Sequence, residues 1–443
     1  MPMEGAIHLE IKKEFKCSCG RIHKSGIEAY AIGAGAMNTV LQYLEKYACQ
    51  SPFIVADVNT YQAAGDKLCS ILQNGGYAYT QYILQDEHVE PDERVAGLLM
   101  MHYPTAADCI IGVGSGVVND LCKILSRVSG NPYILIATAP SMDGYASVTS
   151  SVVMDGLKWS IEGKCADVII GDTDILKNAP KKMLIAGLGD LLAKYIALAD
   201  WRIANLVTGE YYCEEIAQLV RVAVKKCMDN SALLLQRDPV AVEAFFSGLL
   251  LSGAAMNYAG ITRVASGIEH SISHIWDMRS VAFGTNSDFH GIQCGIGTLY
   301  AAKIYDKLRH FVPDKEKAIA YAESFDFAAY SKELSAFIGK GASSMIAREA
   351  NDGKYDTAKH AIRIQRICAH WEEILTIIQE EVPPSAEIER ILDAIDAPKT
   401  CADIGIDHAL MPMTFAATKD IRDKYVLSRL CWDLGIINEI DFA

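Results

Sequence analysis

A change of periodicity near residue 180 constrains the fold of this chain more than any other feature. From residue 28 to about 171, short apolar runs alternate with amphipathic stretches, which is typical of βαβ units around a mostly parallel sheet. After Pro180 helical periodicity dominates and strand signals nearly vanish. We therefore expect a Rossmann-like α/β domain over residues 1–178, followed by an all-α domain over residues 179–443.

The predicted strands of the first half are short and apolar, and helical stretches separate them. The strands are 28–32, 53–57, 77–84, 108–113 and 132–138, and the helices are 36–48, 61–73 and 91–103. Two more strands, 148–154 and 158–161, flank Asp155-Gly156, a two-residue turn that predicts a β-hairpin. The long helices of the second half are 181–208, 211–228, 239–258, 291–308 and 358–380, with breaks at Pro383-Pro384 and 397–401.

The charge balance argues against nucleic acid as a partner. The chain has 41 basic and 55 acidic residues, a net charge of −14, and no basic run of the kind that follows a phosphate backbone. No apolar run of membrane-spanning length and no signal-peptide core is found, so we expect no membrane association. The thirteen cysteines are scattered and odd in number, which favours reduced thiols in a cytoplasmic protein.

One group of cysteines suggests a second interpretation. Cys17, Cys19 and His23 lie within seven residues of one another, as in a metal knuckle. A structural zinc site normally has four ligands at wider spacing, which favours an ordinary N-terminal turn here.

A glycine turn follows the fourth predicted strand. Residues 112–116 read Gly-Val-Gly-Ser-Gly, and a helix is expected from Val117 to Ser126. Glycines let a backbone approach a phosphate, and a helix N-terminus offers N–H donors to it, although a simple tight turn is the alternative. The usual dinucleotide fingerprint follows the first strand of its unit, so a plain Rossmann dehydrogenase fits poorly.

Two other strand ends carry polar groups. Asp57 ends the second strand, where a carboxylate can bind ribose hydroxyls and favour NAD over NADP. The alternative is a helix cap, because Asn59 and Thr60 follow.

The loop 138–147 after the fifth strand is rich in polar groups and lies at the carboxyl edge of a parallel sheet, where ligands bind in such folds.

Acidic and imidazole side chains recur on the predicted helices of the second half. Asp190 precedes Lys194 by four residues on an apolar helix, His270 precedes His274 by four, and His290 opens another helix. Three protein ligands with an open position are typical of a catalytic metal site. Buried histidines with a purely structural role are the alternative, because the sequence distance between ligands says nothing about their geometry.

Together these motifs resemble the superfamily of iron-containing alcohol dehydrogenases and dehydroquinate synthases. The resemblance rests on 112–116 with Asp120, on Pro140-Ser141-Met142-Asp143-Gly144, on Gly189-Asp190, on Glu269-His270 with His274, and on His290-Gly291. Within that superfamily, 141–147, 189–195 with Asp200-Trp201, and 266–270 most resemble the sn-glycerol-1-phosphate dehydrogenase family. The resemblance covers roughly residues 25–310, and it implies an N-terminal Rossmann-like domain with a helical C-terminal domain.

The resemblance also implies roles for individual residues. It makes Asp190, His270 and His290 metal ligands, and it places Asp143, Asp190 and His274 at the substrate, with Asp190 and His274 as catalytic residues. The implied dinucleotide contacts are Asp57, Gly114, Gly116, Val117, Val118, Asn119, Asp120, Thr138 and Ser147.

The implied reaction is the reversible reduction of dihydroxyacetone phosphate to sn-glycerol 1-phosphate by NAD(P)H, with NADH favoured. A divalent metal, nickel or zinc with ferrous iron as a third option, acts as the Lewis acid. His274 is a candidate proton relay. Lys194 either binds the substrate phosphate or extends along an apolar helix towards water. A homodimer is expected.

Three other functions compete with this one. A polyol dehydrogenase would act on unphosphorylated glycerol. A cyclase like dehydroquinate synthase would need more basic residues around its phosphate than Lys194, the one lysine in 187–200. A nucleotide-binding protein without activity should have lost a ligand, yet Asp190, His270 and His290 are all present.

Overall fold

The computed structural model describes residues 11–86, 89–154 and 157–442. The chain forms two compact units that interleave along the sequence. Among the described residues, the first contains those up to 154 together with 159–191 and 214–261, and the second contains 157–158, 192–213 and 262–442. Helix α7 (Lys181–Thr208) contributes to both. The domain boundary predicted between residues 178 and 179 coincides with the change from alternating strands and helices to helices alone, and as a domain boundary it stays a prediction.

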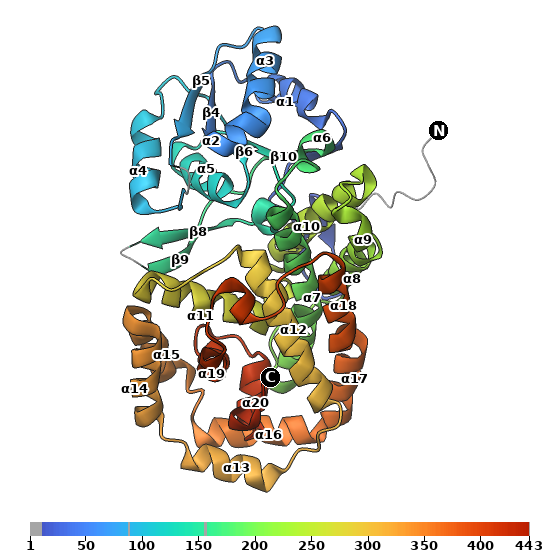
Figure 1. Cartoon of the computed structure of the whole chain (residues 1–443), viewed down its shortest axis with the longest axis vertical. Helices are drawn as coiled ribbons and strands as arrows, with labels where there is room; N and C mark the ends of the chain where they lie inside the picture. The colour runs from blue at the N-terminus through green and yellow to red at the C-terminus, as the bar shows by residue number, and fades with distance from the viewer. Residues whose placement is uncertain (1–10, 87–88, 155–156, 443) are drawn as a thin grey trace. The chain divides into compact units, whose positions relative to one another are not determined.

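A six-stranded parallel sheet forms the centre of the first unit (Figure 1). The five strands predicted from sequence are present with shifts at their ends, and the glycine turn follows the fourth of them. A sixth strand, β10, was not predicted, because its short apolar run carries no periodicity of its own. It pairs with β3 and β7 and so lies inside the sheet. In spatial order the strands are β3 (Ala29–Gly33), β10 (Val168–Asp172), β7 (Tyr133–Ala137), β6 (Cys109–Gly114), β4 (Pro52–Asp57) and β5 (Thr80–Leu84).

Helices cover both faces of this sheet, because alternate residues of a buried strand point to opposite sides. Ile54, Ile111 and Ile134 pack on one side with α1 (Val40–Lys46) and α3 (Asp66–Asn74). On the other side α5 (Gly116–Ser129) contacts β4, β6 and β7, and α4 (Glu93–His102) packs against α5. The four predicted helices of this half are confirmed: 36–48 as a 3-10 turn and α1, 61–73 as a π-helical turn (Tyr61–Gly65) and α3 after the short α2 (Val58–Thr60), 91–103 as α4, and 117–126 as α5.

Two small hairpins complete the strands. The predicted one consists of β8 (Thr149–Met154) and β9 (Leu157–Glu162), and its turn, Asp155-Gly156, lies outside the described residues. An unpredicted one joins β1 (Glu14–Lys16) to β2 (Ile22–Lys24) near the N-terminus.

Helices α8 (Glu214–Asp229) and α10 (Pro239–Ala259) belong to the first unit and pack against each other. Short helices α6 (Thr173–Leu176) and α9 (Ser231–Leu234) accompany them. Contrary to the expectation from sequence, one helix, α10, is long and apolar enough to cross a membrane by length and composition. Of its most apolar stretch 72% is buried inside the protein, as in the core helix of a globular unit. This is weak evidence for a membrane span.

Within residues 192–213 and 262–442 of the second unit, the regular secondary structure consists of helices, joined by short non-helical connections. Its core joins α11 (Ile268–Phe283) to α14, α15 and α19 through residues such as Ile275, Leu334 and Met345. The single helix predicted over 358–380 is wrong: the chain bends at His370 between two helices, and the indole of Trp371 donates a hydrogen bond to Phe311 O. The helices are α12 (His290–Leu308), α13 (Lys315–Ser324), α14 (Phe327–Ile338), α15 (Ala342–Asp352), α16 (Thr357–Ala369), α17 (Trp371–Glu381), α18 (Ser385–Ala394), α19 (Met411–Thr418) and α20 (Leu427–Asp433).

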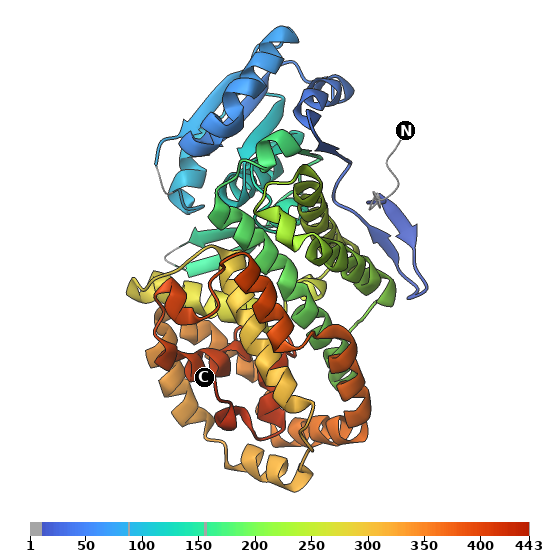
Figure 2. The same cartoon turned by 45° about the vertical axis from the view of Figure 1, so that its right-hand side comes forward.

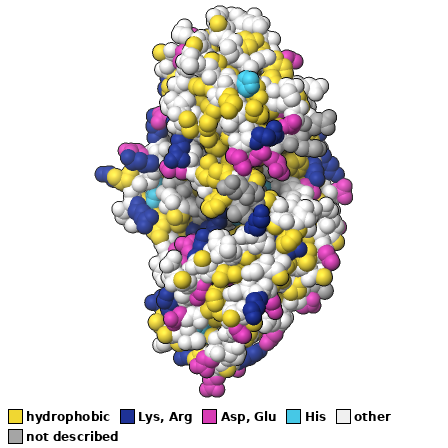
Figure 3. Space-filling model, turned by 90° about the vertical axis from the view of Figure 1, so that its left-hand side faces the viewer, with side chains coloured by type: hydrophobic (Ala, Val, Ile, Leu, Met, Phe, Trp, Pro, Cys, Tyr) yellow, Lys and Arg dark blue, Asp and Glu magenta, His cyan; other side chains and the backbone are white. Residues whose placement is uncertain are grey.

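Charged side chains of both signs are interspersed on the face drawn in Figure 3. This distribution agrees with the absence of basic runs in the sequence.

Candidate metal and substrate site

Two histidines of the second unit meet where α11 and α12 pack together. His270 lies in the first turn of α11 and His290 opens α12, and their ring centroids are 4.9 Å apart. Cys294, one turn further along α12, joins them, so that one donor atom from each residue lies within 4.8 Å of the other two. The spacing of the sequence motifs singled out both histidines but not Cys294.

The Nδ1 atom of His270 is held by a buried carboxylate. It lies 2.7 Å from Glu269 Oε1, which also accepts a hydrogen bond from Gly267 N at 2.7 Å. Because a carboxylate only accepts, the proton of neutral His270 is on Nδ1 and the lone pair is on Nε2. A histidine that binds a metal typically has such a carboxylate behind it.

The tautomer of His290 follows from a chain of hydrogen bonds. Gln293 Nε2 donates to Asp277 Oδ1, so Gln293 Oε1 faces Ser273 and accepts the Ser273 hydroxyl proton at 2.7 Å. Ser273 Oγ must then accept from His290 Nδ1, which lies 2.9 Å away. The lone pair of His290 is therefore on Nε2 as well, and that atom lies 3.5 Å from Cys294 Sγ.

His274 stacks on His290 with ring centroids 5.6 Å apart and an interplanar angle of 25°. It lies one turn after His270 on α11, as the spacing predicted. The structure thus brings together His270, His274 and His290 within one unit.

The buried carboxylate of Asp200 is hydrogen-bonded to the start of α11. Asp200 accepts hydrogen bonds from Ile268 N at 2.8 Å, from Tyr305 Oη at 2.6 Å and from Leu427 N at 3.1 Å. Burial, together with the negative charge of Glu269, raises the pKa of Asp200 to about 7. Gly267 is required at this turn, because a Cβ atom there would lie 2.7 Å from Glu269 Oε2 and 2.8 Å from Asp200 Oδ2.

Two lysines of the second unit lie at the turn that precedes α11. Lys194 is fully buried, and its Nζ donates to Ala265 O at 3.0 Å, so it does not extend along its helix to water. Lys424 donates to Thr262 Oγ1, Ser266 O and Ser266 Oγ at 2.8–3.2 Å. Burial lowers the pKa of Lys424 well below its usual value. Lys424 was not predicted, since nothing in its local sequence connects it with residue 266.

In the first unit, Asp190 on α7 lies next to the loop that follows β7. Its Oδ2 accepts a hydrogen bond from Asp143 N at 2.7 Å, and Ser252 Oγ donates to Asp143 Oδ2 at 2.9 Å. The backbone packs closely here, because a Cβ atom on Gly187 would overlap the carbonyl oxygen of Pro140. Asp143 and Asp190 are thus adjacent and largely buried, and their contact with a substrate stays a prediction.

The predicted phosphate turn lies between β6 and α5. Thr138 N donates to Gly114 O at 3.1 Å, and Ser115 Oγ lies 2.5 Å from Ser141 Oγ, so this turn and the loop after β7 are adjacent. The first N–H groups of a helix have no acceptor within it, and at α5 these are Gly116, Val117 and Val118. This arrangement provides donors for an anion.

Asn119 and Lys123 attach α5 to the same loop. Asn119 Nδ2 donates to Gly144 O at 3.2 Å and its Oδ1 accepts from Tyr133 Oη at 3.1 Å, so both ends of its amide are used inside the protein. Lys123 is fully buried, and its Nζ donates to Gly144 O, Ser147 Oγ and Thr149 O at 2.6–3.1 Å. Asp120 lies 3.4 Å from the same ammonium and accepts from Ser151 N. The sequence analysis did not identify Lys123.

Asp57 caps the short helix after β4. Its Oδ1 accepts from Thr60 N at 2.8 Å, and Thr60 Oγ1 accepts from Asp57 N at 3.0 Å. The helix-cap interpretation is therefore confirmed, and the ribose contact stays a prediction.

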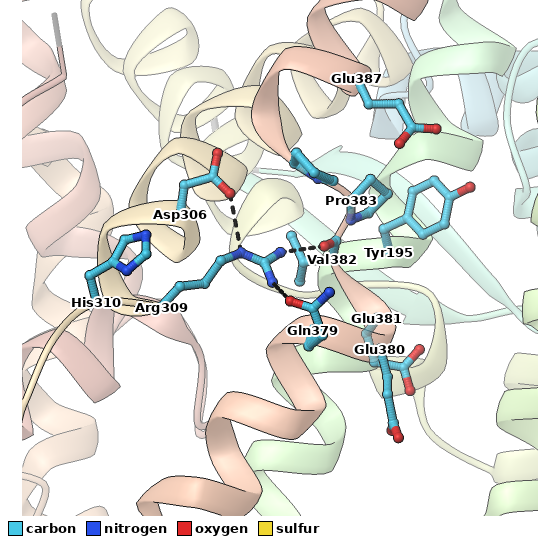
Figure 4. A pocket seen from close by; sticks show the side chains of 11 residues that line it. Tyr195, Asp306, Arg309, His310, Gln379, Glu380, Glu381, Val382, Pro383 and Glu387 are labelled. Carbon is cyan, nitrogen blue, oxygen red and sulfur yellow. Dashed lines mark hydrogen bonds and ion pairs between the residues drawn. The ribbon is translucent and has the colours of Figure 1, made fainter.

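A separate pocket of about 440 Å³ opens in the second unit (Figure 4). Arg309 lies in its wall, but its guanidinium donates to Asp306, Gln379 and Val382. The pocket shares no residue with the histidine cluster, and the carboxylates in its lining disfavour a phosphorylated ligand. These carboxylates belong to Asp306, Glu380, Glu381 and Glu387.

Comparison with known proteins identifies the family. The profile of the iron-containing alcohol dehydrogenases matches residues 31–180. The chain is 27% identical over 416 residues to the glycerol-1-phosphate dehydrogenase (NAD(P)+) of Halalkalibacterium halodurans, a match that covers 93% of this chain and 94% of that protein. It is 33% identical over 285 residues to the protein of the same name from Geobacillus thermodenitrificans, covering 64% and 70% respectively. The chain belongs to the glycerol-1-phosphate dehydrogenase family.

Solved structures confirm the fold of the family. A probable glycerol dehydrogenase from Sinorhizobium meliloti superposes with a TM-score of 0.57 at 16% identity, over 94% of this chain and 98% of that one. The predicted architecture, a parallel-sheet N-terminal region followed by a helical region, is therefore confirmed.

Proposed function

We propose that this protein catalyses the reversible reduction of dihydroxyacetone phosphate to sn-glycerol 1-phosphate, using NAD(P)H and a divalent metal. The observation that carries this proposal is the histidine pair, in which the protein engages both Nδ1 atoms, so that the metal-binding lone pair of each ring is on Nε2. It occurs in a chain whose relatives are named glycerol-1-phosphate dehydrogenase.

The proposed metal ligands are Asp190, His270 and His290. One carboxylate with two imidazoles suits zinc, nickel or ferrous iron, and Cys294 adds a soft sulfur donor beside the two imidazoles. Sulfur favours zinc and nickel over the harder metals, so we propose Zn²⁺ or Ni²⁺. A bound metal supplies the Lewis acid that polarises the substrate carbonyl, and the nicotinamide supplies the hydride.

The chain's own residues orient the donors and handle the proton. Glu269 and Ser273 hold His270 and His290 in single tautomers, and Asp143 N fixes one oxygen of Asp190. His274 lies beside this pair, where its imidazole can deliver a proton to the substrate oxygen. We assign Asp190 and His274 as catalytic residues and Asp143 as a substrate contact.

Lys194 and Lys424 are the proposed partners of the substrate phosphate. Both ammonium groups lie at the turn 262–266, which leads directly into the His270 helix. A buried cation interacts strongly with an anion, because little water screens the pair. This pair also favours a phosphorylated substrate over glycerol.

The dinucleotide is proposed to lie along the edge formed by the ends of β4, β6 and β7. The N–H groups of residues 116–118 would bind its pyrophosphate. The carboxylate of Asp57 would accept the ribose hydroxyls and repel a 2′-phosphate, so NADH is the favoured cofactor. The remaining proposed contacts are Gly114, Asn119, Asp120, Thr138 and Ser147.

The assembly and location are also proposals. No disulfide joins the thirteen cysteines, all of which the structure describes, and this fits the reducing cytoplasm. A homodimer is the commonest assembly of such enzymes, and light scattering of the purified protein tests it.

Substrate comparison tests the function. We expect stoichiometric NADH oxidation with dihydroxyacetone phosphate and, in reverse, faster oxidation of sn-glycerol 1-phosphate than of glycerol or sn-glycerol 3-phosphate. Faster turnover of glycerol would instead identify a polyol dehydrogenase. Release of phosphate without net NADH oxidation would identify a cyclase.

Replacing a ligand tests the metal assignment. We expect His270→Ala to remove the catalytic metal and turnover while NADH binding, measured by fluorescence, stays within about twofold of wild type. Unchanged turnover in this variant would contradict the assignment of His270.

A further inference from the structure

The N-terminal hairpin of the first unit presents three metal-ligand side chains together. Cys17 and Cys19 lie in the turn between β1 and β2, and His23 lies on β2 opposite Phe15. The turn is tight: Gly20 adopts φ +85°, and its N–H donates to Cys17 O at 3.1 Å. A left-handed residue at this position favours glycine, and the turn points both thiols towards the imidazole.

The donor atoms converge at distances that suit one metal ion. Cys19 Sγ lies 3.3 Å from His23 Nε2, and one ring nitrogen of His23 and the Sγ atoms of Cys17, Cys19 and Cys213 all lie within 4.8 Å of one another. A tetrahedral zinc with bonds of about 2.0–2.3 Å separates its ligand atoms by about 3.5–3.8 Å. Cys17 Sγ also accepts a hydrogen bond from Cys19 N at 3.4 Å, which stabilises a thiolate.

His23 is held in the tautomer that a metal requires. Its Nδ1 lies 2.6 Å from the carbonyl oxygen of Tyr258, and since a carbonyl only accepts, Nδ1 carries the proton. The lone pair on Nε2 therefore faces Cys19 Sγ. The ring is 1% exposed and packs against Phe15, so its orientation is fixed. This is the same arrangement that holds His270 and His290.

The fourth donor is the thiol of Cys213, which lies just before α8 in the sequence. Cys213 is buried and directly precedes Glu214, the first residue of α8. The hairpin is tied to this helix, because Ser18 N donates to Glu215 Oε1 at 2.9 Å. Sequence alone gave no sign of this ligand, because it lies far along the chain from the hairpin.

We propose that Cys17, Cys19, His23 and Cys213 bind a structural zinc ion, separate from the metal of the proposed active site. Three sulfurs and one nitrogen form a closed set with no position for substrate, which is typical of structural rather than catalytic zinc. Sulfur-rich sites select zinc over the hard metals. The ion would attach the β1–β2 hairpin to the residue that precedes α8, while the hydrogen bond of His23 to Tyr258 holds β2 beside α10 (Figure 2).

Metal counting on the full chain tests this site independently of the active site. For protein produced with zinc, we expect about two metal ions per chain in the wild type and about one in Cys17→Ser/Cys19→Ser. His270→Ala should lose the other ion, and the combined variant should lose both. Cys368→Ser, a partly buried cysteine outside the cluster, is the matched control and should retain both. His23→Cys should keep the ion and His23→Asn should lose it.

A second measurement leaves all four ligands intact. In His270→Ala/Cys294→Ser, loading with Co²⁺ should give strong sulfur-to-cobalt charge-transfer absorption from a tetrahedral thiolate site. Absence of that band, or a wild-type content of one ion that His270→Ala removes, would overturn the proposal. A Cys17–Cys19 disulfide in freshly purified protein, detected by mass spectrometry, would overturn it as well. If the wild type contains one ion and His270→Ala retains it, only the metal site of the proposed function would be contradicted.

Discussion

At the scale of single residues, Glu269 determines which ring nitrogen of His270 carries the proton and which carries the lone pair. Its buried carboxylate accepts the Nδ1 proton, and the negative charge makes the opposite nitrogen a better donor. We expect Glu269→Gln to weaken the affinity for the catalytic metal about 10–100-fold, measured by competition with a chelator. NADH affinity should stay unchanged, because Glu269 acts through His270. Glu333→Gln on α14 is an exposed control, and an unaltered metal affinity in Glu269→Gln would contradict this role.

Asp57 combines a structural contact with a proposed selective one. Asparagine caps helices as well as aspartate does, so Asp57→Asn should preserve the cap on Thr60 while it removes the charge. We expect the ratio of kcat/KM for NADPH to that for NADH to rise by about tenfold or more, about 1.4 kcal/mol. Steady-state kinetics with both cofactors checks this, and an unchanged ratio would refute the ribose contact.

Asp200 should make the stability of the protein depend on pH. Its folded pKa of about 7 lies above the ordinary value of 3.8, so the folded state binds the proton more tightly than the unfolded state. Its favourable contribution is complete below about pH 4 and is lost as the pH rises to about 7. We expect the difference in unfolding free energy between wild type and Asp200→Asn to change by about 2–4 kcal/mol over this window and to stay flat above it. Denaturant titrations at each pH measure it, and a flat difference from pH 4 to 7 would contradict the raised pKa.

At the scale of elements, α5 and the loop after β7 form one assembly through Lys123. Its ammonium bridges the helix to Gly144, Ser147 and Thr149, and several proposed cofactor contacts lie on these two segments. We expect Lys123→Met to lose about 2–4 kcal/mol of unfolding free energy, because buried carbonyl oxygens lose a charged donor. NADH affinity should fall as well, as calorimetry would show. Lys332→Met, at an exposed position, is the control. If Lys123→Met bound NADH with wild-type affinity, the contacts of Lys123 would have no role in cofactor binding.

At the scale of the whole molecule, the final segment completes the second unit. Lys424 bonds to Ser266, Arg263 donates to Tyr425 O, and Leu427 N donates to Asp200. Ending the chain after residue 423 removes these partners together with α20, so we expect residues 262–423 to become sensitive to proteases and turnover to vanish. A truncated protein as resistant as wild type would contradict this.

A milder change isolates one of these contacts. Leu427 is the first residue of α20, where proline is tolerated, so Leu427→Pro removes the N–H that Asp200 accepts and replaces one buried apolar side chain with a smaller one. We expect it to lower Tm while α20 and metal binding are retained.

The sequence by itself determined the features that repeat over short distances. The two patterns of periodicity predicted the parallel sheet and the helices, and the predicted limits of α7 agree with the observed Lys181–Thr208. The glycine turn and the capping residues around Asp57 were also recognisable, because backbone conformation and caps depend on neighbouring residues. The histidine spacing on α11 followed in the same way.

Only the tertiary structure decided which distant groups meet. Nothing local marks β10 as an inner strand or divides residues 358–380 at His370. The partners of His290 and of His23 come from other elements: Ser273 on α11, which Gln293 orients, holds His290, and Tyr258 holds His23. Which donor bonds to which acceptor depends on their positions in space, and these positions are fixed only once the cores have packed. The sequence therefore contained the ligands, and the fold supplied the contacts that orient them.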